Sequence, residues 1–354
     1  MALTFGGSHL RGNHASRPAA NTLVEGALYY CTDHHKVYRG TGPTNTWSDY
    51  TEALATAADL AAVSANAAPE ICCGRLTLES GVAVSTTDQT GKTTVYFTPY
   101  KGNRIALFDL AAWDTLTFAE TSLALGTLTS GKNYDVFGYD NGGTFALELS
   151  AAWTNDTTRA DALAVQDGVL CKSGALTRRY LGTFRTTSTT TTEDSAGGTT
   201  TNVGGKRFLW NYYNRVERDF GVIDTANSWT YTTNTWRQAN GNAGNKVEFV
   251  VGVNEDAVRA VGVAVAFVQN NSTRSARASI VLDSTTVPGK VVGGGFITTG
   301  PGIFTSMPLA FTGRAGIGYH YLAWVEAGAD GTSNFIGDNA GGGEQSGFYG
   351  TLFG

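Results

Sequence analysis

Short apolar runs separated by turn-forming residues follow one another from Arg75 to the last of the 354 residues. The turn signals recur roughly every 8 to 15 residues, which is typical of antiparallel strands in sandwiches and barrels. The 45 glycines occur between these runs and only 7 residues are proline, so the glycines mark turns and show no collagen-like period. The sequence therefore predicts a mainly β protein made of antiparallel β-sandwich or jelly-roll domains.

The first 50 residues predict a small separate module. Two short aromatic strands, residues 27–31 and 36–39, flank the turn-forming stretch Thr32-Asp33-His34-His35 and indicate a β-hairpin. A lone hairpin is marginally stable in water. We therefore expect residues 1–50 to dock on a partner surface as an anchoring module.

Residues 51–69 predict the one helix of the chain. The stretch TEALATAADLAAVSANAA is Ala-rich, and Pro69 ends it. Its apolar side carries little bulk, which suits three copies packed around an axis as an oligomeric neck. A monomeric linker helix is the alternative.

Two strand-rich blocks follow, at 70–185 and 206–354, with TTSTTTTEDSAGGTTTNVGG between them at 186–205. That stretch offers almost nothing to bury, so we expect a Thr/Gly-rich linker or loop. In the first block, YDNGGT at 139–144 predicts a hairpin because Asn-Gly supplies positive φ. The second block is expected to be a jelly-roll-like sandwich. Its runs KVEFVVGV and AVGVAVAFV predict strands buried on both faces, inside a sandwich or at a subunit interface.

Charge and cysteine content exclude several classes of protein. The net charge is −5 and only 16% of residues are charged, so no long-range attraction to phosphate backbones is expected and nucleic acid is not a predicted partner. No apolar run approaches the roughly 20 residues of a membrane helix, so no membrane insertion is predicted. The 4 cysteines are too few and too irregularly spaced for a disulfide framework. We expect free thiols.

Residue patterns that carry chemistry are absent from the sequence. Adjacent histidines in a strand or turn point to opposite sides, and adjacent cysteines lack the C-x-x-C spacing of zinc and redox sites. The glycine runs lack the strand, helix and Lys of a phosphate loop. We therefore predict no enzyme, no cofactor, no metal, and no catalytic, cofactor-binding or metal-ligating residue. The motifs rejected are His34-His35, Cys72-Cys73, Gly293-Gly294-Gly295 and Gly341-Gly342-Gly343.

The N-terminal text RPAANTLVEGALYYCTDHHKVYRGTGPTNTW resembles the N-terminal segments of fibre and appendage proteins of tailed bacteriophages. Most of the chain from Arg75 onward is similar to an uncharacterised family of phage-encoded proteins, which has no established activity or functional residues. The phrases that carry this similarity are LTLESGVAV, YFTPYKGNRIALFD, LTSGKNYDVFGYDN, LELSAAWTNDTTRADAL, LTRRYLGTFRTT, RFLWNYYNRV and GYHYLAWVEAG.

The resemblance implies a virion structural protein, and such proteins are commonly homotrimers. We expect a tail fibre or spike, attached to other tail or capsid proteins through residues 1–70 and displaying β domains for host adsorption. It would be made in the host cytoplasm and located in the virion, since the N-terminus lacks the apolar core of a signal peptide. A head fibre or capsid decoration protein is the alternative.

A glycan-degrading tailspike enzyme is a third hypothesis, because it needs only two carboxylates in a cleft. The acidic pairs Glu193-Asp194, in the Thr-rich stretch, and Glu255-Asp256, in an expected turn, are scattered, and no regular β-helix period is present. This hypothesis is therefore not preferred.

Aromatic and amide side chains in the second block offer a surface for a host glycan or receptor. Aromatic faces beside amides hold sugars by stacking and hydrogen bonding. The alternative is that these rings fill the sandwich core, and the sequence singles out no individual receptor residue. The group comprises Trp210, Tyr212, Tyr213, Trp229, Tyr231, Trp236, Arg237 and Asn240.

Overall fold

The structure, a computed structural model, describes residues 9–12, 28–33, 36–41, 46–49, 68–198, 203–268, 274–286, 295–298, 304–329, 332–338, 340 and 343–354. The chain divides into two compact units, Met1–Ala67 and Ala68–Gly354, and each is described by itself. The described residues confirm a mainly β protein with mostly antiparallel sheets. Helical residues among them are few: the 3-10 turn η5 (Ala239–Gly241) and Ala340. The predicted helical neck at 51–69 lies almost entirely outside the described residues.

The first unit contains a four-stranded sheet in the order β1 (His9–Gly12), β2 (Leu28–Cys31), β3 (Lys36–Thr41) and β4 (Thr46–Asp49). The predicted hairpin is confirmed: β2 and β3 are antiparallel, with Leu28 opposite Arg39 and Cys31 opposite Lys36. Strand β1 pairs with β2 in parallel, and neither β1 nor β4 was predicted. His34 and His35 lie outside the described residues.

The second unit begins with three sheets that pack on a common aromatic core. The rings of Phe97, Phe118 and Phe145 lie 5.1 to 5.2 Å apart at its centre. The first sheet pairs β8 (Arg104–Phe108) with β9 (Trp113–Thr117). The second has the order β10 (Thr121–Ala124), β7 (Thr94–Pro99) and β5 (Gly74–Thr77). The third has the order β12 (Phe145–Leu149), β11 (Asn133–Asp140), β15 (Ala175–Arg185), β14 (Val169–Lys172) and β13 (Leu163–Gln166), and β18 (Leu209–Asn211) also pairs with β15.

The hairpin predicted at 139–144 joins β11 to β12 and is confirmed. Its turn lies one residue later than Asn-Gly implies. The Asn141 amide donates to the Thr144 carbonyl at 2.8 Å, and Gly142 and Gly143 take the positive φ values of 65° and 87°. Glycine takes positive φ without steric cost, so Gly142-Gly143 form the two-residue turn in place of Asn-Gly.

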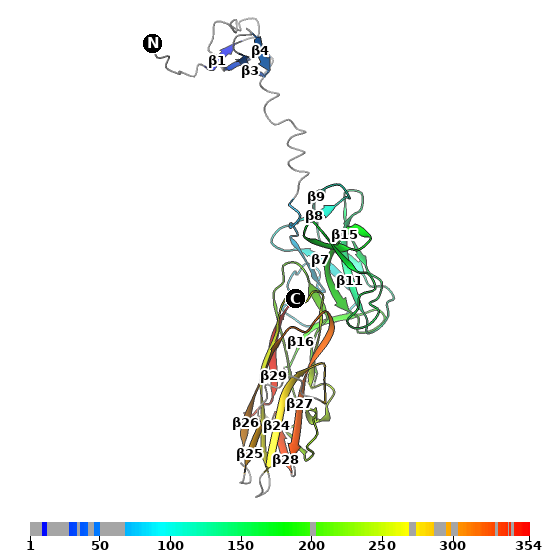
Figure 1. The fold of residues 1–354 in the computed structure, drawn as a ribbon, viewed down its shortest axis with the longest axis vertical. Coiled ribbons are helices and arrows are strands. Elements are labelled where there is room, and N and C mark those ends of the chain that lie inside the picture. Colours follow the sequence, from blue (N-terminus) through cyan, green and yellow to red (C-terminus); the bar gives the residue numbers. More distant parts are fainter. Residues whose placement is uncertain are drawn as a thin grey trace, which may run out of the picture. The chain divides into compact units, whose positions relative to one another are not determined.

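Two larger sheets pack face to face in the rest of the unit (Figure 1). Phe249 and Trp324 of one sheet and Phe220, Phe335 and Phe348 of the other belong to one buried core, which makes a β-sandwich. The first sheet has the order β25 (Gly295–Thr298), β24 (Arg274–Leu282), β27 (Gly318–Ala329), β22 (Lys246–Val251), β17 (Gly204–Arg207), β16 (Thr192–Gly197) and β6 (Gln89–Lys92), with β21 (Arg237–Gln238) on β27. The second has the order β19 (Glu217–Ile223), β29 (Gly347–Phe353), β23 (Val258–Val268), β28 (Ser333–Ile336) and β20 (Ser228–Tyr231), with β26 (Thr305–Gly313) on β23.

The expected linker or loop at 186–205 is wrong over residues 192–197, which form strand β16, and over residues 204–205, which begin β17. This strand buries Thr192, Asp194 and Ser195. Composition missed it because the buried side chains are polar and are held by hydrogen bonds and ion pairs instead of apolar packing. Strand β16 also pairs with β6 from the first block, so the blocks 70–185 and 206–354 share a sheet.

The two apolar runs of the second block differ in what covers them. In β22, Val247, Phe249 and Val250 are completely buried, but Lys246 and Glu248 on the outer face are only half-buried, so the prediction of burial on both faces holds in part. In β23, the inward-facing Ala264 is buried, whereas Val261 on the opposite face is 67% exposed. One face of β23 is thus covered within the chain and the other is partly open.

Candidate ligand-binding face

Strand β27 presents two different faces, because successive side chains of a strand alternate. Leu322 and Trp324 point into the core shared by both sheets. Ala323 and Val325 point the other way, and with Val281 of β24 they form a separate small apolar cluster. This second cluster lies on the outer face of the eight-stranded sheet.

Small side chains form the floor of this outer face. Ala323 and Val325 are 0% exposed and Val281 is 5% exposed, because Trp236 and Tyr321 pack over them. The register places Lys246 of β22 directly beside Ala323. A long side chain beside a small one leans across it, which gives a shallow floor bordered by rings and cations.

Each of three partly exposed rings on this face is accompanied by a cation. The Arg185 guanidinium lies 3.7 Å from the Tyr319 ring centre. The Lys246 ammonium lies 5.2 Å from Tyr321. On the far side of the floor, the Arg277 guanidinium lies 5.5 Å from the ring of Trp236. These distances suit cation–π attraction. We call these six residues the aromatic face: Arg185, Trp236, Lys246, Arg277, Tyr319 and Tyr321.

Hydrogen bonds to Glu248 fix the orientation of Tyr319 and of the neighbouring Lys246. Glu248 accepts from the Lys246 ammonium at 3.1 Å and from the Tyr319 hydroxyl. Burial and the hydrogen bond to Glu248 raise the pKa of Tyr319 above its ordinary value, and burial and Asp283 raise the pKa of Tyr321. Both phenols therefore keep their protons at neutral pH and remain hydrogen-bond donors.

The loop that carries Trp236 is held in place at both ends. The Tyr231 hydroxyl donates to the Thr235 carbonyl at 2.9 Å, and the Gly328 amide donates to the Thr233 carbonyl at 3.0 Å. The side chains of residues 232–235 are exposed and supply hydroxyl and amide groups beside the rings. A fixed ring next to such groups has the means to stack on a sugar and to hydrogen-bond it.

A buried carboxylate anchors the same loop from the inner side. Glu326 is 0% exposed. It accepts from the Arg237 Nε at 2.9 Å, from the Trp229 Nε1 at 2.7 Å and from the Asn240 amide at 3.1 Å. Burial raises its pKa to about 7, although the bonds from Trp229 and Arg237 act in the opposite direction. Arg237 and Asn240 thereby hold the segment on which Trp236 is carried.

The residues singled out from the sequence thus have four different locations. Trp210 and Trp229 are buried in the sandwich core, as the alternative hypothesis states. Trp236 belongs to the aromatic face. Arg237 and Asn240 bind Glu326, with Tyr231 stacked under Arg237 at 3.8 Å. The remaining two, Tyr212 and Tyr213, line a separate cavity.

Sequence reasoning missed Tyr319, Tyr321, Lys246 and Arg277. In the sequence, the phrase GYHYLAWVEAG serves as one of those that carry the resemblance to phage-encoded proteins. Its alternation of Tyr319, Tyr321 and Ala323 on one side indicates two rings beside a small residue. That alternation was the available signal. Lys246 and Arg277 lie beside it only through strand pairing, which the sequence does not display.

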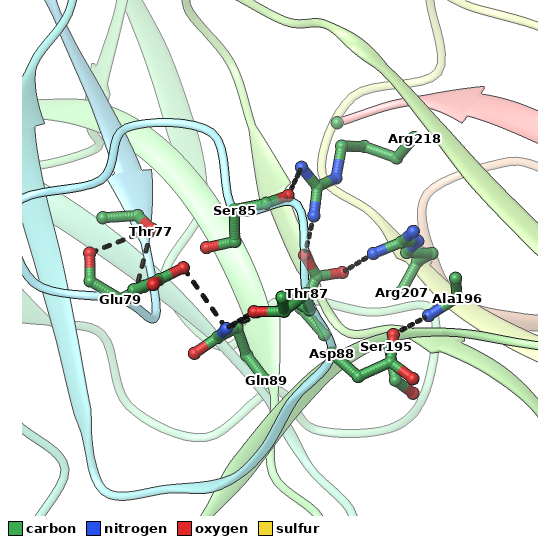
Figure 2. A network of polar contacts seen from close by, with 12 residues as sticks. Thr77, Glu79, Ser85, Thr87, Asp88, Gln89, Ser195, Ala196, Arg207 and Arg218 are labelled. Atoms are coloured by element: carbon green, nitrogen blue, oxygen red, sulfur yellow. Dashed lines mark hydrogen bonds and ion pairs between the residues drawn. The ribbon is translucent and has the colours of Figure 1, made fainter.

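The acidic pairs considered for hydrolysis form ion pairs with basic side chains, and Glu193 pairs with Lys206 at 3.2 Å. Asp194 is buried in β16, where its carboxylate contacts Arg207 at 3.1 Å and Arg218 at 2.7 Å. Figure 2 shows these two arginines beside the segment that carries Ser85 and Asp88. Glu255 and Asp256 both pair with Arg215, at 2.7 and 2.6 Å.

Cys72, Cys73 and Cys171 are free thiols, and burial raises the pKa of Cys72 to about 11. Within the described ranges, no three or more His, Cys, Asp or Glu residues are grouped so as to hold a metal ion. In the same part of the chain, no helix is long and apolar enough to cross a membrane. Gly293, Gly294, Gly341 and Gly342 lie outside the described residues.

None of the known protein-family models matches the chain, and neither does any curated protein. Among solved structures, the Major Tropism Determinant U1 and I1 variants are each 15% identical over 69% of this chain, with TM-scores of 0.20 and 0.21. The chain spans 56% of their length. The structure of infectious bursal disease virus Gx strain is 10% identical over 64% of this chain and 73% of that one, with a TM-score of 0.23. Similarity at this level does not establish a common fold, and no property is transferred from these proteins.

Proposed function

We propose that this chain is a structural protein of a bacteriophage virion, a tail fibre or spike, and that it binds carbohydrate on the host surface through the aromatic face. The virion setting is supported by the phage-like phrases of the sequence. The observation that carries the binding proposal is the row of three partly exposed rings, each beside a cation, over a floor of small side chains.

This shallow face suits sugar rings better than it suits a ligand that must be enclosed in a deep pocket. Their C–H faces stack on aromatic rings, and their hydroxyls take up donors and acceptors that are already in place. Glu248 and Asp283 supply acceptors, while Lys246 and Arg277 supply donors. Because the loop and Tyr319 are held by hydrogen bonds before binding, little ordering is needed when the ligand arrives.

We also propose that the chain is a homotrimer that uses the outer face of the six-stranded sheet. Val261 and Tyr349 lie opposite each other on β23 and β29, and are 67% and 48% exposed. The apolar run of β23 predicts burial on both faces, and a second copy of the chain would cover the open one. Three copies would present three aromatic faces, so weak single-site binding would gain from avidity.

The binding proposal is tested by replacing Tyr321 with Ala and measuring binding of the purified chain to host surface glycans. We expect a loss of affinity of about fivefold or more, since one stacked ring contributes on the order of 1 kcal/mol or more. Tyr139→Ala is the matched control, because Tyr139 is also stacked under an arginine: the Arg178 guanidinium lies 4.0 Å from its ring centre. Both residues belong to a sheet that does not carry Tyr321. Equal loss in both variants, or loss in neither, would refute the assignment.

Reversible binding without hydrolysis is part of the same proposal. Incubation of the chain with host glycans is expected to release no reducing sugar, and steady release would favour the tailspike enzyme instead. Labelling of residues 1–70 on intact particles distinguishes a tail fibre from a head fibre or decoration protein. For the trimer, Val261→Lys is expected to yield monomers by light scattering, whereas an unchanged mass would place the interface elsewhere.

A further inference from the structure

A cavity of about 190 Å³ lies beside β15, away from the residues of the aromatic face. Its volume corresponds to roughly six water molecules, taking about 30 Å³ for each. It therefore has room for a small organic molecule. Its walls are formed by Pro69, Glu70, Asp167, Gly168, Val169, Arg179, Tyr212 and Tyr213.

Arg179 in this wall is a buried cation without a carboxylate. Its side chain is 1% exposed, and no acidic group of the described residues lies within ion-pair distance. Its Nη1 donates to the carbonyls of Pro69 and Ala106, both at 2.7 Å, but its Nη2 is buried with no hydrogen-bond partner there. A buried charge is normally paired, since leaving it unpaired is costly.

The second donor at this site is Tyr213. Its hydroxyl oxygen accepts from the Arg179 Nε at 3.1 Å, so its own hydrogen is directed elsewhere, and none of the described residues accepts it. Burial raises the pKa of Tyr213 above its ordinary value, against the opposing effect of Arg179. The phenol thus stays protonated. Two neighbouring donors, one of them on a buried guanidinium, are what a carboxylate oxygen pair requires.

The rim of the cavity limits the charge of a ligand. Glu70 and Asp167 are exposed, and Asp167 is fixed by bonds from the Trp113 Nε1 at 3.0 Å and the Gln166 Nε2 at 2.9 Å. These carboxylates repel a dianion such as phosphate more than a monoanion. Tyr212, Val169 and Pro69 supply apolar wall, which suits the carbon skeleton behind a single carboxyl group.

We propose that this cavity binds a small monocarboxylate, whose carboxyl group pairs with Arg179 and Tyr213 and whose carbon skeleton lies against Tyr212. Two sources share that chemistry: a free short-chain carboxylate and the carboxyl group of a uronic acid in a surface polysaccharide. In either case the ligand supplies the counter-charge that Arg179 lacks.

The test is titration of the full chain by calorimetry with propionate, glucuronate, propionamide and inorganic phosphate. We expect propionate or glucuronate to bind and the other two not to bind. Tighter binding of glucuronate assigns the site to a uronic acid, and binding of propionate alone assigns it to a free carboxylate. Binding of propionamide as strong as that of propionate, or no binding of either carboxylate, overturns the proposal.

Tyr213→Phe gives a second, independent measurement, because it removes one hydroxyl and keeps the ring. We expect the Kd of the bound carboxylate to rise about tenfold, in line with the loss of one hydrogen bond to a charged group. Arg178→Met is the matched control. Arg178 precedes Arg179 on the same strand, but it pairs with Glu148 at 2.8 Å and does not line this cavity. Unchanged affinity in Tyr213→Phe, or an equal change in the control, contradicts the proposed site.

Discussion

Replacing Asp194 with Asn tests whether the sandwich is held together by a buried charge. Asp194 comes from β16 of the eight-stranded sheet and binds Arg218 of β19, in the six-stranded sheet, at 2.7 Å. It also binds Arg207 at 3.1 Å, and all three side chains are at most 8% exposed. The pair to Arg218 therefore connects the two layers directly.

The expected loss of stability follows from the interactions that Asn cannot make. Asn has the same shape, so no cavity forms, but its amide nitrogen meets a guanidinium donor and its oxygen carries no charge. A hydrogen bond to a charged group contributes about 1.5 to 3 kcal/mol, and breaking a buried ion pair costs about 3 to 5 kcal/mol. Arg75 adds to the loss. Burial and the nearby Arg218 lower the pKa of Arg75 to about 10, and the Asp194 carboxylate acts in the opposite direction. The Asn variant removes that favourable charge. We expect the free energy of unfolding in urea to fall by about 3 to 5 kcal/mol.

Glu193→Gln is the control within the same strand. Glu193 pairs with Lys206 at 3.2 Å, where the side chains are 15% and 29% exposed. An ion pair near the surface contributes about 0 to 1 kcal/mol, so this variant should unfold almost like the original chain at the same protein concentration. If Asp194→Asn lost no more stability than Glu193→Gln, the reasoning about the buried pair would be refuted.

Three further measurements address other parts of the chain. Because the pKa of Glu326 is about 7 in place of the ordinary 4.5, its contribution to the free energy of unfolding is complete below pH 4.5. It is lost as the pH rises to 7, by up to about 3 kcal/mol, and Glu326→Gln should remove this part of the pH profile measured in urea. Burial raises the pKa of Cys72 and Cys171 to about 11, so alkylation of the folded chain at pH 8, followed by mass spectrometry, should modify them only after unfolding; rapid modification of both would contradict their burial. Deletion of residues 1–50 should leave the thermal unfolding of the remainder intact but prevent its incorporation into particles, and retained incorporation would refute the anchor.

Local features of the fold were predictable from the sequence, and features that depend on strand pairing were not. The hairpin at 139–144 was found because its turn chemistry lies in six consecutive residues. Strand β16 was missed because its buried residues are Thr, Asp and Ser, which resemble a loop until their partners are known. Arg207 lies 13 residues beyond Asp194, and Arg218 24 residues beyond it.

The aromatic face shows the same limit. Trp236 was singled out as a ring beside amides, but its partner Arg277 and the floor under it come from β24 and β27. Which rings share a face depends on the register between strands, and a shift by one residue reverses every side chain. The sequence thus predicted the residue types of the proposed binding surface and one of its rings.

Although the chain carries few charged residues, several of its carboxylates are buried and paired. Only 16% of the residues are charged, yet among the described residues of the second unit a buried carboxylate pairs with arginine at three places: Asp135 with Arg159 at 2.8 Å, Asp194 with two arginines, and Glu326 with Arg237 at 2.7 Å. Each of these carboxylates restricts the local packing to one arrangement, because a shift that left a buried carboxylate without its arginine would be strongly destabilising. Glu326 lies on β27, the strand that also carries Tyr319 and Tyr321 on its opposite face. The ion pair that fixes Arg237 against β27 therefore also holds Trp236 relative to the two tyrosines. If the proposed sugar binding takes place here, a rigid spacing between the rings would let the face select one sugar arrangement over another.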